Sequence, residues 1–171
     1  MWLKAKAQGH CYVLGMLLAL TGAVMAAPQS NIDIMYSGTL IDAPPCTING
    51  GEPVEIDFGE VGVNKVDGQN YAQTFTLTYK CEGTSTNKVL RYLGAATTFD
   101  TAAVQSNIPE FGIRLQHQKD GVITPFVVGS TLAIPSYLGA STFIATPVKN
   151  TGVELQEGAF TAAATLQLEY P

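Results

Sequence analysis

Few side chains in this chain have types and spacing that could do chemistry. Cys46 and Cys81 are two potential thiolates, but two cysteines alone do not make a zinc site, and no ligand spacing surrounds His117. His117 with Ser130 or Ser136 has the composition of a general base and a nucleophile, yet the spacing matches no hydrolase motif. A surface histidine is therefore the favoured interpretation of His117.

Acidic residues offer a second candidate site, because paired carboxylates can act as general acid and base. Glu55, Asp57 and Glu60 follow one another closely, on the outer face of a predicted strand and in the loop after it. Acids in such places usually only solvate a surface. No Gly-x-Ser-x-Gly motif, phosphate-binding glycine loop or calcium loop occurs. The sequence therefore predicts no catalytic residue, no metal ligand and no cofactor, and hence a protein that is not an enzyme.

Composition predicts one folded domain with a hydrophobic core. The chain has 171 residues, of which 46% are hydrophobic and 13% charged. Nine Lys and Arg residues stand against 14 Asp and Glu, giving a net charge of −5. Because such a surface repels phosphate groups and offers no basic stripe, nucleic-acid binding is excluded.

The first residues are typical of a targeting segment. A positively charged start precedes an apolar run at residues 11–20, which is too short to span a bilayer. Val24 and Ala26 suit the −3 and −1 positions of a signal peptidase site, so residues 1–26 are predicted to be a signal peptide. Cleavage after Ala27 and an uncleaved anchor are the alternatives. The mature protein is predicted to be exported and soluble.

Export also determines the state of the cysteines. Cys11 leaves with the signal peptide, and Cys46 and Cys81 remain as a pair in an oxidising compartment. A disulfide between them is predicted, worth roughly 3–4 kcal/mol in the chain-entropy model.

Alternation of apolar and polar residues predicts an all-β chain. A hairpin turn is expected at residues 119–121, an edge strand around Pro125 and a strand end at Pro147 and Asn150. Residues 89–93 are apolar but cannot be oriented by periodicity. Many short strands with one disulfide indicate an immunoglobulin-like β-sandwich. The alternating runs cover residues 32–40, 54–58, 71–81, 111–115, 122–128, 143–148 and 160–170.

Both ends of the mature chain carry such a run, and each poses the question of what pairs with it. The last strand reaches the terminus with almost no tail, and an open strand edge invites pairing with another chain. Residues 32–40 could pair within their own sheet as an ordinary first strand, or pair with a neighbouring molecule. The residues alone leave both possibilities open.

Several motifs together resemble the pilin subunits of chaperone–usher fimbriae of Gram-negative bacteria. The segment Ser37-Gly-Thr-Leu-Ile-Asp-Ala-Pro-Pro-Cys-Thr-Ile-Asn49 is similar to the family's junction between N-terminal extension and first cysteine. Val54-Glu-Ile-Asp-Phe-Gly59 is similar to the strand that follows it. Gly158 is fourteenth from the C-terminus and Tyr170 is penultimate, as in the family. The Pro-Pro-Cys stretch is most similar to minor, adaptor-type subunits of the P-pilus tip.

The resemblance implies an incomplete immunoglobulin-like sandwich that lacks its seventh strand. A periplasmic chaperone and then a neighbouring subunit would supply this strand at the outer-membrane usher, and residues 27–40 would be donated in turn from a pilin domain at 41–171. Gly38 is similar to the family's donor-strand glycine. The implied donor residues are Ile32, Ile34, Tyr36, Gly38 and Leu40, and the implied acceptor edge is Gly158, Phe160, Ala162, Ala164, Leu166, Leu168 and Tyr170.

The function expected from this resemblance is that of a structural subunit, minor or adaptor, of an adhesive fimbria on the cell surface. The alternative is a fimbrial tip adhesin that binds a host glycan. A two-domain adhesin needs another domain before the pilin domain, whereas Cys46 follows the expected cleavage site by only about twenty residues. A secreted hydrolase is the least favoured possibility, because no catalytic arrangement supports it.

Overall fold

The computed structural model describes residues 32–40, 45–82, 88–134 and 138–170. The chain divides into two units, Met1–Thr39 and Leu40–Pro171. The predicted signal peptide and both candidate cleavage sites lie outside the described residues. No helix in the described ranges is long and apolar enough to cross a membrane.

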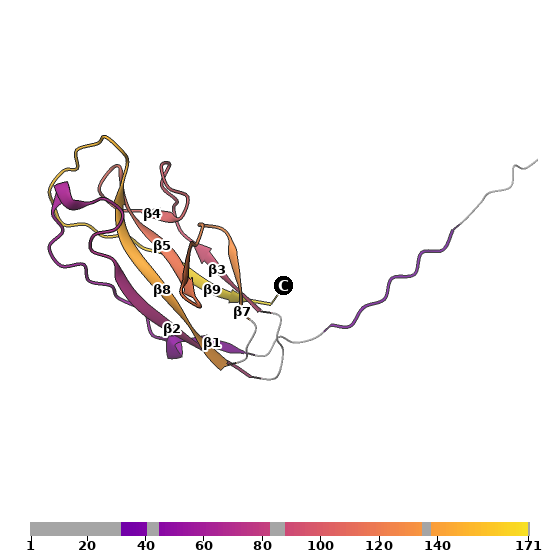
Figure 1. The fold of residues 1–171 in the computed structure, drawn as a ribbon. Coiled ribbons are helices and arrows are strands. Elements are labelled where there is room, and N and C mark those ends of the chain that lie inside the picture. Colours follow the sequence, from indigo (N-terminus) through magenta and orange to yellow (C-terminus); the bar gives the residue numbers. More distant parts are fainter. Residues whose placement is uncertain (1–31, 41–44, 83–87, 135–137, 171) are drawn as a thin grey trace, which may run out of the picture. The chain divides into compact units, whose positions relative to one another are not determined.

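Two antiparallel sheets form the second unit (Figure 1). The larger sheet has the order β1-β2-β8-β5-β4, with β6 also paired to β5, and the smaller has the order β7-β3-β9. The predicted all-β architecture is confirmed. The elements are β1 (Cys46–Ile48), η1 (Asn49–Gly51), η2 (Val63–Lys65), β2 (Gln73–Cys81), β3 (Lys88–Leu93), β4 (Ala103–Gln105), β5 (Phe111–Lys119), β6 (Val122–Pro125), β7 (Thr131–Ile134), β8 (Leu138–Lys149) and β9 (Thr165–Glu169).

Strand β2 shows how the sequence pattern becomes a packed core. Leu77 and Tyr79 are buried, while the threonines between the apolar residues are exposed, as the period of two requires. Leu77 and Tyr79 join a cluster that spans both sheets, including Tyr92 of β3 and Phe143 of β8. Phe143 is fully buried and stacks against Phe75 and Phe126 at centroid distances of 5.8 and 6.0 Å.

The predicted disulfide is present. Cys46 and Cys81 are directly opposite each other in the antiparallel pair of β1 and β2, and their sulfur atoms are bonded. Because β1 has only three residues and lies at the edge of its sheet, this bond supplements a short hydrogen-bonded ladder.

The hairpin between β5 and β6 also agrees with the sequence prediction. Asp120 and Gly121 have φ values of +51° and +78°, the left-handed pair that a tight two-residue hairpin turn needs. Strand β6 pairs only with β5 and ends at Pro125, so it lies at an edge as predicted.

Of the two residues at which this strand was predicted to end, Asn150 is confirmed and Pro147 is wrong. Strand β8 continues through Pro147 to Lys149, with Pro147 opposite Ile113 of β5. In this part of β8 only β5 is a neighbour, because β2 pairs no further than Ala145. A proline is tolerated here, since its missing N–H is not needed on the side that has no partner.

Two further predicted strands, at residues 32–40 and 54–58, belong to no strand in the described part of the chain. In residues 32–40 the alternating apolar side chains are largely exposed, with Tyr36 at 90% and Leu40 at 103%. The prediction failed because alternation reports which face is apolar, whereas a strand also requires a neighbouring chain to pair with.

Candidate functional site

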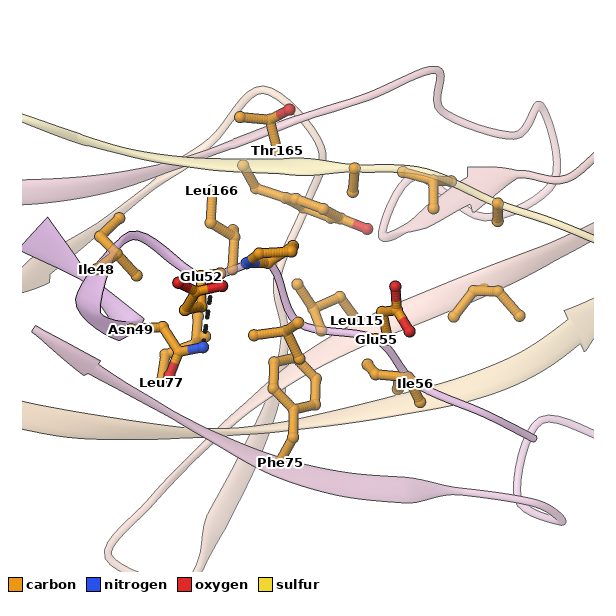
Figure 2. A pocket seen from close by; sticks show the side chains of 18 of the residues that line it. Ile48, Asn49, Glu52, Glu55, Ile56, Phe75, Leu77, Leu115, Thr165 and Leu166 are labelled. Atoms are coloured by element: carbon orange, nitrogen blue, oxygen red, sulfur yellow. Dashed lines mark hydrogen bonds between the residues drawn. The ribbon is translucent and has the colours of Figure 1, made fainter. Parts of the chain in front are cut away.

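An open groove of about 870 Å³ runs along the second unit (Figure 2). One rim is the segment at residues 52–58, here called the first rim, and the other is the terminal segment at residues 160–166, the second rim. In Figure 2, Phe75 points into the groove from one side and Leu166 from the other. The floor is apolar and comes from five strands, through Phe75, Leu77, Tyr92, Val104, Leu115 and Ala145.

Tyr92 is the tyrosine among the floor residues, and its hydroxyl is the floor's one titratable group. Its side chain is only 1% exposed, and burial raises the pKa of Tyr92, with the negative charge of Asp100 adding to the effect. The hydroxyl therefore stays neutral at any physiological pH, and the floor carries no charge.

The first rim presents a main chain without partners. Val54, Ile56 and Phe58 line the groove or its end, as their alternation with Glu55 and Asp57 predicts. Among the residues that the structure describes, no hydrogen bond joins the main chain of residues 53–58 to another segment. This rim is therefore a strand-like edge with free donors and acceptors.

The second rim is held on one side only. The Thr161 carbonyl accepts a hydrogen bond from the Asn107 amide (3.1 Å), and the Thr161 amide donates to Asn107 Oδ1 (2.7 Å). Peptide groups of successive residues in an extended chain point to opposite sides, so those of Phe160 and Ala162 point towards the groove. Ala162 and Ala164 are exposed although they lie above a buried floor.

Aromatic rings close one end of the groove. Phe160 lies with its ring centroid 6.1 Å from that of Phe58 on the first rim and 4.9 Å from that of Phe111 on β5. Gly158 precedes this contact with φ +156°, a value that residues with a side chain rarely adopt. Gly158 lies in a second, smaller cavity of about 410 Å³, which also contains Lys65 and Glu157.

Below the groove, the last residues of the chain anchor the second rim. Only Thr165–Glu169 forms a strand, β9, and it pairs with β3. Leu168 packs against the core, and the Tyr170 hydroxyl donates to Sγ of the disulfide-bonded Cys46 (2.9 Å). Four of the predicted acceptor residues line the groove: Phe160, Ala162, Ala164 and Leu166. Gly158 lines the smaller cavity instead. The other two, Leu168 and Tyr170, line neither.

An ion pair fixes β9 to β3. Arg91 Nε donates to both carboxylate oxygens of Glu169, at 2.8 and 2.9 Å, and Arg91 Nη1 donates to the Gly129 carbonyl (3.3 Å). The hydrogen bond and charge of Arg91 hold the pKa of Glu169 below its usual value of 4.5. This pair joins β9 to β3 beside the five-residue ladder between them.

Acid is expected to weaken this attachment. Because the pKa of Glu169 is lower in the folded chain, the stabilisation is complete above about pH 4.5 and disappears as the pH falls through the folded value. Urea unfolding of the mature chain should therefore show Glu169→Gln less stable than wild type at pH 7, with a smaller difference near pH 3. Glu154→Gln, an exposed acid with no ion pair to the described residues, should match wild type at both pH values.

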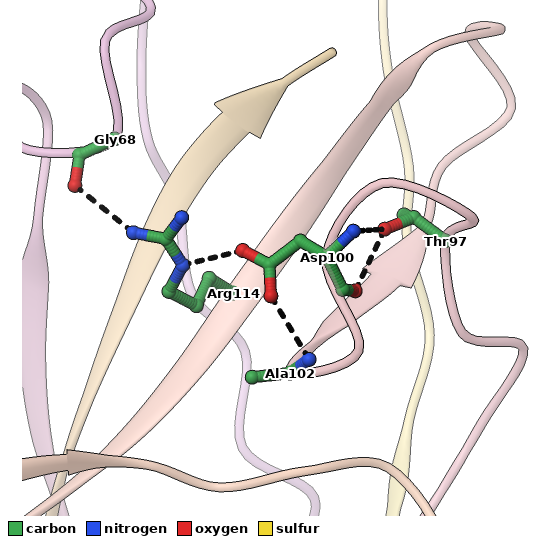
Figure 3. A network of polar contacts seen from close by, with 5 residues as sticks. All are labelled: Gly68, Thr97, Asp100, Ala102 and Arg114. Carbon is green, nitrogen blue, oxygen red and sulfur yellow. Dashed lines mark hydrogen bonds and ion pairs between the residues drawn. The ribbon is translucent and has the colours of Figure 1, made fainter. Parts of the chain in front are cut away.

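A polar network on the other side of β5 supports the floor (Figure 3). Arg114 lies between the groove-lining Ile113 and Leu115, so its side chain points away from the groove. Arg114 Nε donates to the Asp100 carboxylate, which also accepts from the Ala102 amide (2.9 Å). Arg114 also donates to the Gly68 carbonyl (3.5 Å), and the Asp100 main chain pairs with the Thr97 hydroxyl. These bonds tie two loops to the strand that forms the floor.

Catalytic chemistry finds no support in the geometry. His117 is partly buried with its ring 5.4 Å from that of Phe143, and burial lowers its pKa, assisted by the charge of Lys119. The Ser130 hydroxyl donates to the Val127 carbonyl (2.6 Å), and Ser136 lies outside the described residues. Within the ranges that the structure covers, no three His, Cys, Asp or Glu side chains could hold a metal ion together.

A comparison with known families identifies the chain. The model of the family described as "Fimbrial protein" matches residues 34–171, which is most of the sequence and includes both rims of the groove. The chain belongs to this family. Fimbrial-like protein YfcR of Escherichia coli (strain K12) is 31% identical over 160 residues, or 91% of this chain and 91% of that protein.

Two adaptor comparisons agree with this fimbrial assignment. Fimbrial adapter PapF of Escherichia coli is 29% identical over 163 residues, covering 90% of this chain and 94% of PapF. A solved structure of the P pilus adaptor subunit PapF superposes with a TM-score of 0.59 at 27% identity, covering 75% of this chain and 98% of that one. The predicted immunoglobulin-like pilin fold is confirmed. The predicted function, a structural subunit of an exported surface fimbria and not an enzyme, is confirmed as well.

Sequence reasoning missed the floor of the groove in this fimbrial protein. Tyr92 falls in the apolar run that periodicity could not orient, and Val104 lies in the three-residue β4, which was not predicted. The first rim was predicted to be a half-buried strand but not one side of a groove. Its signal was the alternation of Val54, Ile56 and Phe58, with no strand predicted to pair with it.

Proposed function

We propose that this chain is a minor or adaptor subunit of a fimbria, joined to its neighbours by exchange of a β-strand. The observation that carries the proposal is the apolar groove with an unpaired main-chain edge on each side. An extended segment laid between the rims would hydrogen-bond to both edges and bury alternate side chains in the floor, which is the strand-addition mode of recognition. Pilin–chaperone complexes are among the examples by which that mode is known.

The segment at residues 32–40 is the proposed donor to a neighbouring subunit. Its residues Ile32, Ile34, Tyr36 and Leu40 are all at least 65% exposed and recur at every second position except at Gly38. Burial of four or five such side chains at about 1.5–3 kcal/mol each gives on the order of 10 kcal/mol before the cost of ordering the strand. Main-chain hydrogen bonds to the two rims would add to this gain.

The proposal assigns a role to each part of the chain. Residues 1–26 direct export, residues 27–40 are the donor extension, and residues 41–171 form the pilin domain. A periplasmic chaperone fills the groove first, and at the outer-membrane usher a neighbouring subunit replaces it. The similarity to PapF, whose name describes a fimbrial adapter, favours an adaptor position over a rod position. The floor of the groove is apolar, which does not favour the alternative of a glycan-binding tip adhesin.

Expression in the periplasm with and without the cognate chaperone tests this proposal. The mature chain is expected to aggregate or be degraded alone, because about 870 Å³ of apolar groove stays open, and to form a soluble one-to-one complex with the chaperone. Pulse-chase labelling and size-exclusion chromatography measure both outcomes. A long-lived soluble monomer made without any chaperone would contradict the proposal.

A further inference from the structure

The first rim of the groove carries only negative charge, and the second rim contains no charged residue. The first rim and the two residues after it contain Glu52, Glu55, Asp57 and Glu60, and residues 154–169 contain Glu154, Glu157 and Glu169. Neither stretch contains a lysine or an arginine. Glu157 lines the smaller cavity and Glu169 pairs with Arg91, so the acids beside the groove itself are those of the first rim.

Most of this charge is not neutralised within the described residues. Glu169 pairs with Arg91, but Glu52, Glu55, Asp57 and Glu60 are exposed and make no ion pair with any residue that the structure describes. Glu52 and Glu55 are the charged residues that line the groove itself, beside its apolar side chains (Figure 2). Lys65 lines the smaller cavity, together with Glu157.

A strand in the groove would bring its own charges between these rims. Alternate side chains of that strand would face the floor. The side chains between them would point outward, beside the acids of the first rim. Opposite charges on adjacent strands stabilise the pair, and like charges destabilise it. The first rim therefore discriminates between donor strands by the charge of their outward-facing residues. This discrimination is independent of the apolar residues that fill the floor.

The chain's own extension is a poor electrostatic match for its own groove. Residues 27–45 contain Asp33 and Asp42 and no lysine or arginine. Whichever way the extension runs, its outward-facing Asp33 has the same charge as the acids of the first rim. Resting on the proposed function, we infer that the groove selects the donor extension of a different subunit, one with outward-facing Lys or Arg, and disfavours a second copy of this chain.

Two synthetic peptides test this inference. The first is the chain's own residues 29–42, and the second is the same peptide with Asp33→Lys and Thr39→Lys, which leaves the apolar positions unchanged. The mature chain is diluted from denaturant into fluorescently labelled peptide, and association is followed by anisotropy. At about 20 mM salt the basic peptide should associate roughly tenfold faster, and at 0.5 M salt the two rates should converge because screening shortens the range of the charges.

Variants of the chain show whether the rim causes the preference. The triple change Glu52→Gln, Glu55→Gln and Asp57→Asn should reduce the rate ratio at low salt to about twofold or less. Asp57→Asn keeps the oxygen that accepts the Gly59 amide (2.8 Å). The matched control is Asp120→Asn in the β5–β6 turn, an exposed acid that does not line the groove, and it should keep the tenfold ratio.

The outcomes separate the two proposals. If both peptides bind at equal rates in low salt, the charge selectivity is wrong and strand exchange stands. If the preference persists in the triple variant, the rim acids are not its source and the inference is overturned. If neither peptide binds, the groove is not a strand acceptor, and the proposed function is overturned together with the inference.

Discussion

A copy of residues 30–42 fused after Pro171 is expected to let the mature chain accumulate in the periplasm as a soluble monomer without a chaperone. The fused segment would fill the groove from within the same molecule, so its apolar residues cover the floor and its main chain pairs with both rims. After ordering costs, the gain is roughly 5 kcal/mol, or on the order of 15 °C in Tm for a domain of this size. Circular dichroism melting curves of the fused and unfused chains measure it.

Linker length in this fusion reports the direction of the inserted strand. A four-residue linker allows the copy to turn back beside β9 only in the antiparallel direction. A flexible linker of about 20 residues spans roughly 25 Å, which also permits the parallel direction. Success with both linkers indicates an antiparallel donor, and success with the long linker alone a parallel one.

The control fusion carries Ile34→Asp and Tyr36→Asp in the copy. Two carboxylates facing an apolar floor cannot be solvated there, so this fusion should behave like the unfused chain. Equal stabilisation by both copies would mean that the segment acts without entering the groove.

Gly38→Trp is expected to abolish addition of this subunit to its neighbour while leaving its complex with the chaperone intact. Gly38 shares the inward-facing register with Tyr36 and Leu40, so a large side chain there would have to enter the neighbour's floor. The extension is not the part that a chaperone covers, so the subunit's own groove is unaffected. Polymerisation in vitro, followed by gel electrophoresis of unboiled samples, measures the loss.

Thr39→Trp is the matched control for that substitution. It adds the same side chain one position further on, where alternation points it outward, and should slow polymerisation only a few-fold. Normal polymerisation of Gly38→Trp would show that the proposed register of the donor strand is wrong. Equal loss in both variants would show that bulk anywhere in the extension interferes.

Where clear alternation coincides with strong β-forming residues, the sequence predicted the strand well. Strands β2 and β5 combine alternation with Thr, Phe and Leu residues, and the β5–β6 hairpin follows from Asp120-Gly121. The disulfide followed from export alone. At each of these places local preference and tertiary pairing agree, so either one is sufficient to predict the structure.

The site could be predicted only in part, because its defining property is a missing neighbour. Alternation placed Phe160, Ala162, Ala164 and Leu166 on one face, and these residues do line the groove. It could not show that Val54 and Ile56 form the opposite rim, since the two segments are about a hundred residues apart and nothing local couples them. Tyr92 and Val104 of the floor come from long-range packing, which a single sequence does not reveal.

The position of the disulfide has a mechanical consequence for a fibre built in the proposed way. If a neighbour holds residues 32–40, a pulling force enters this subunit just before Cys46, at the start of β1. A three-residue edge strand would peel away from its sheet one hydrogen bond at a time. The bond to Cys81 instead passes the tension covalently to the nine-residue β2, whose ladder with β8 is loaded along its length. In such a fibre the disulfide would keep β1 of each subunit from being pulled out of its sheet.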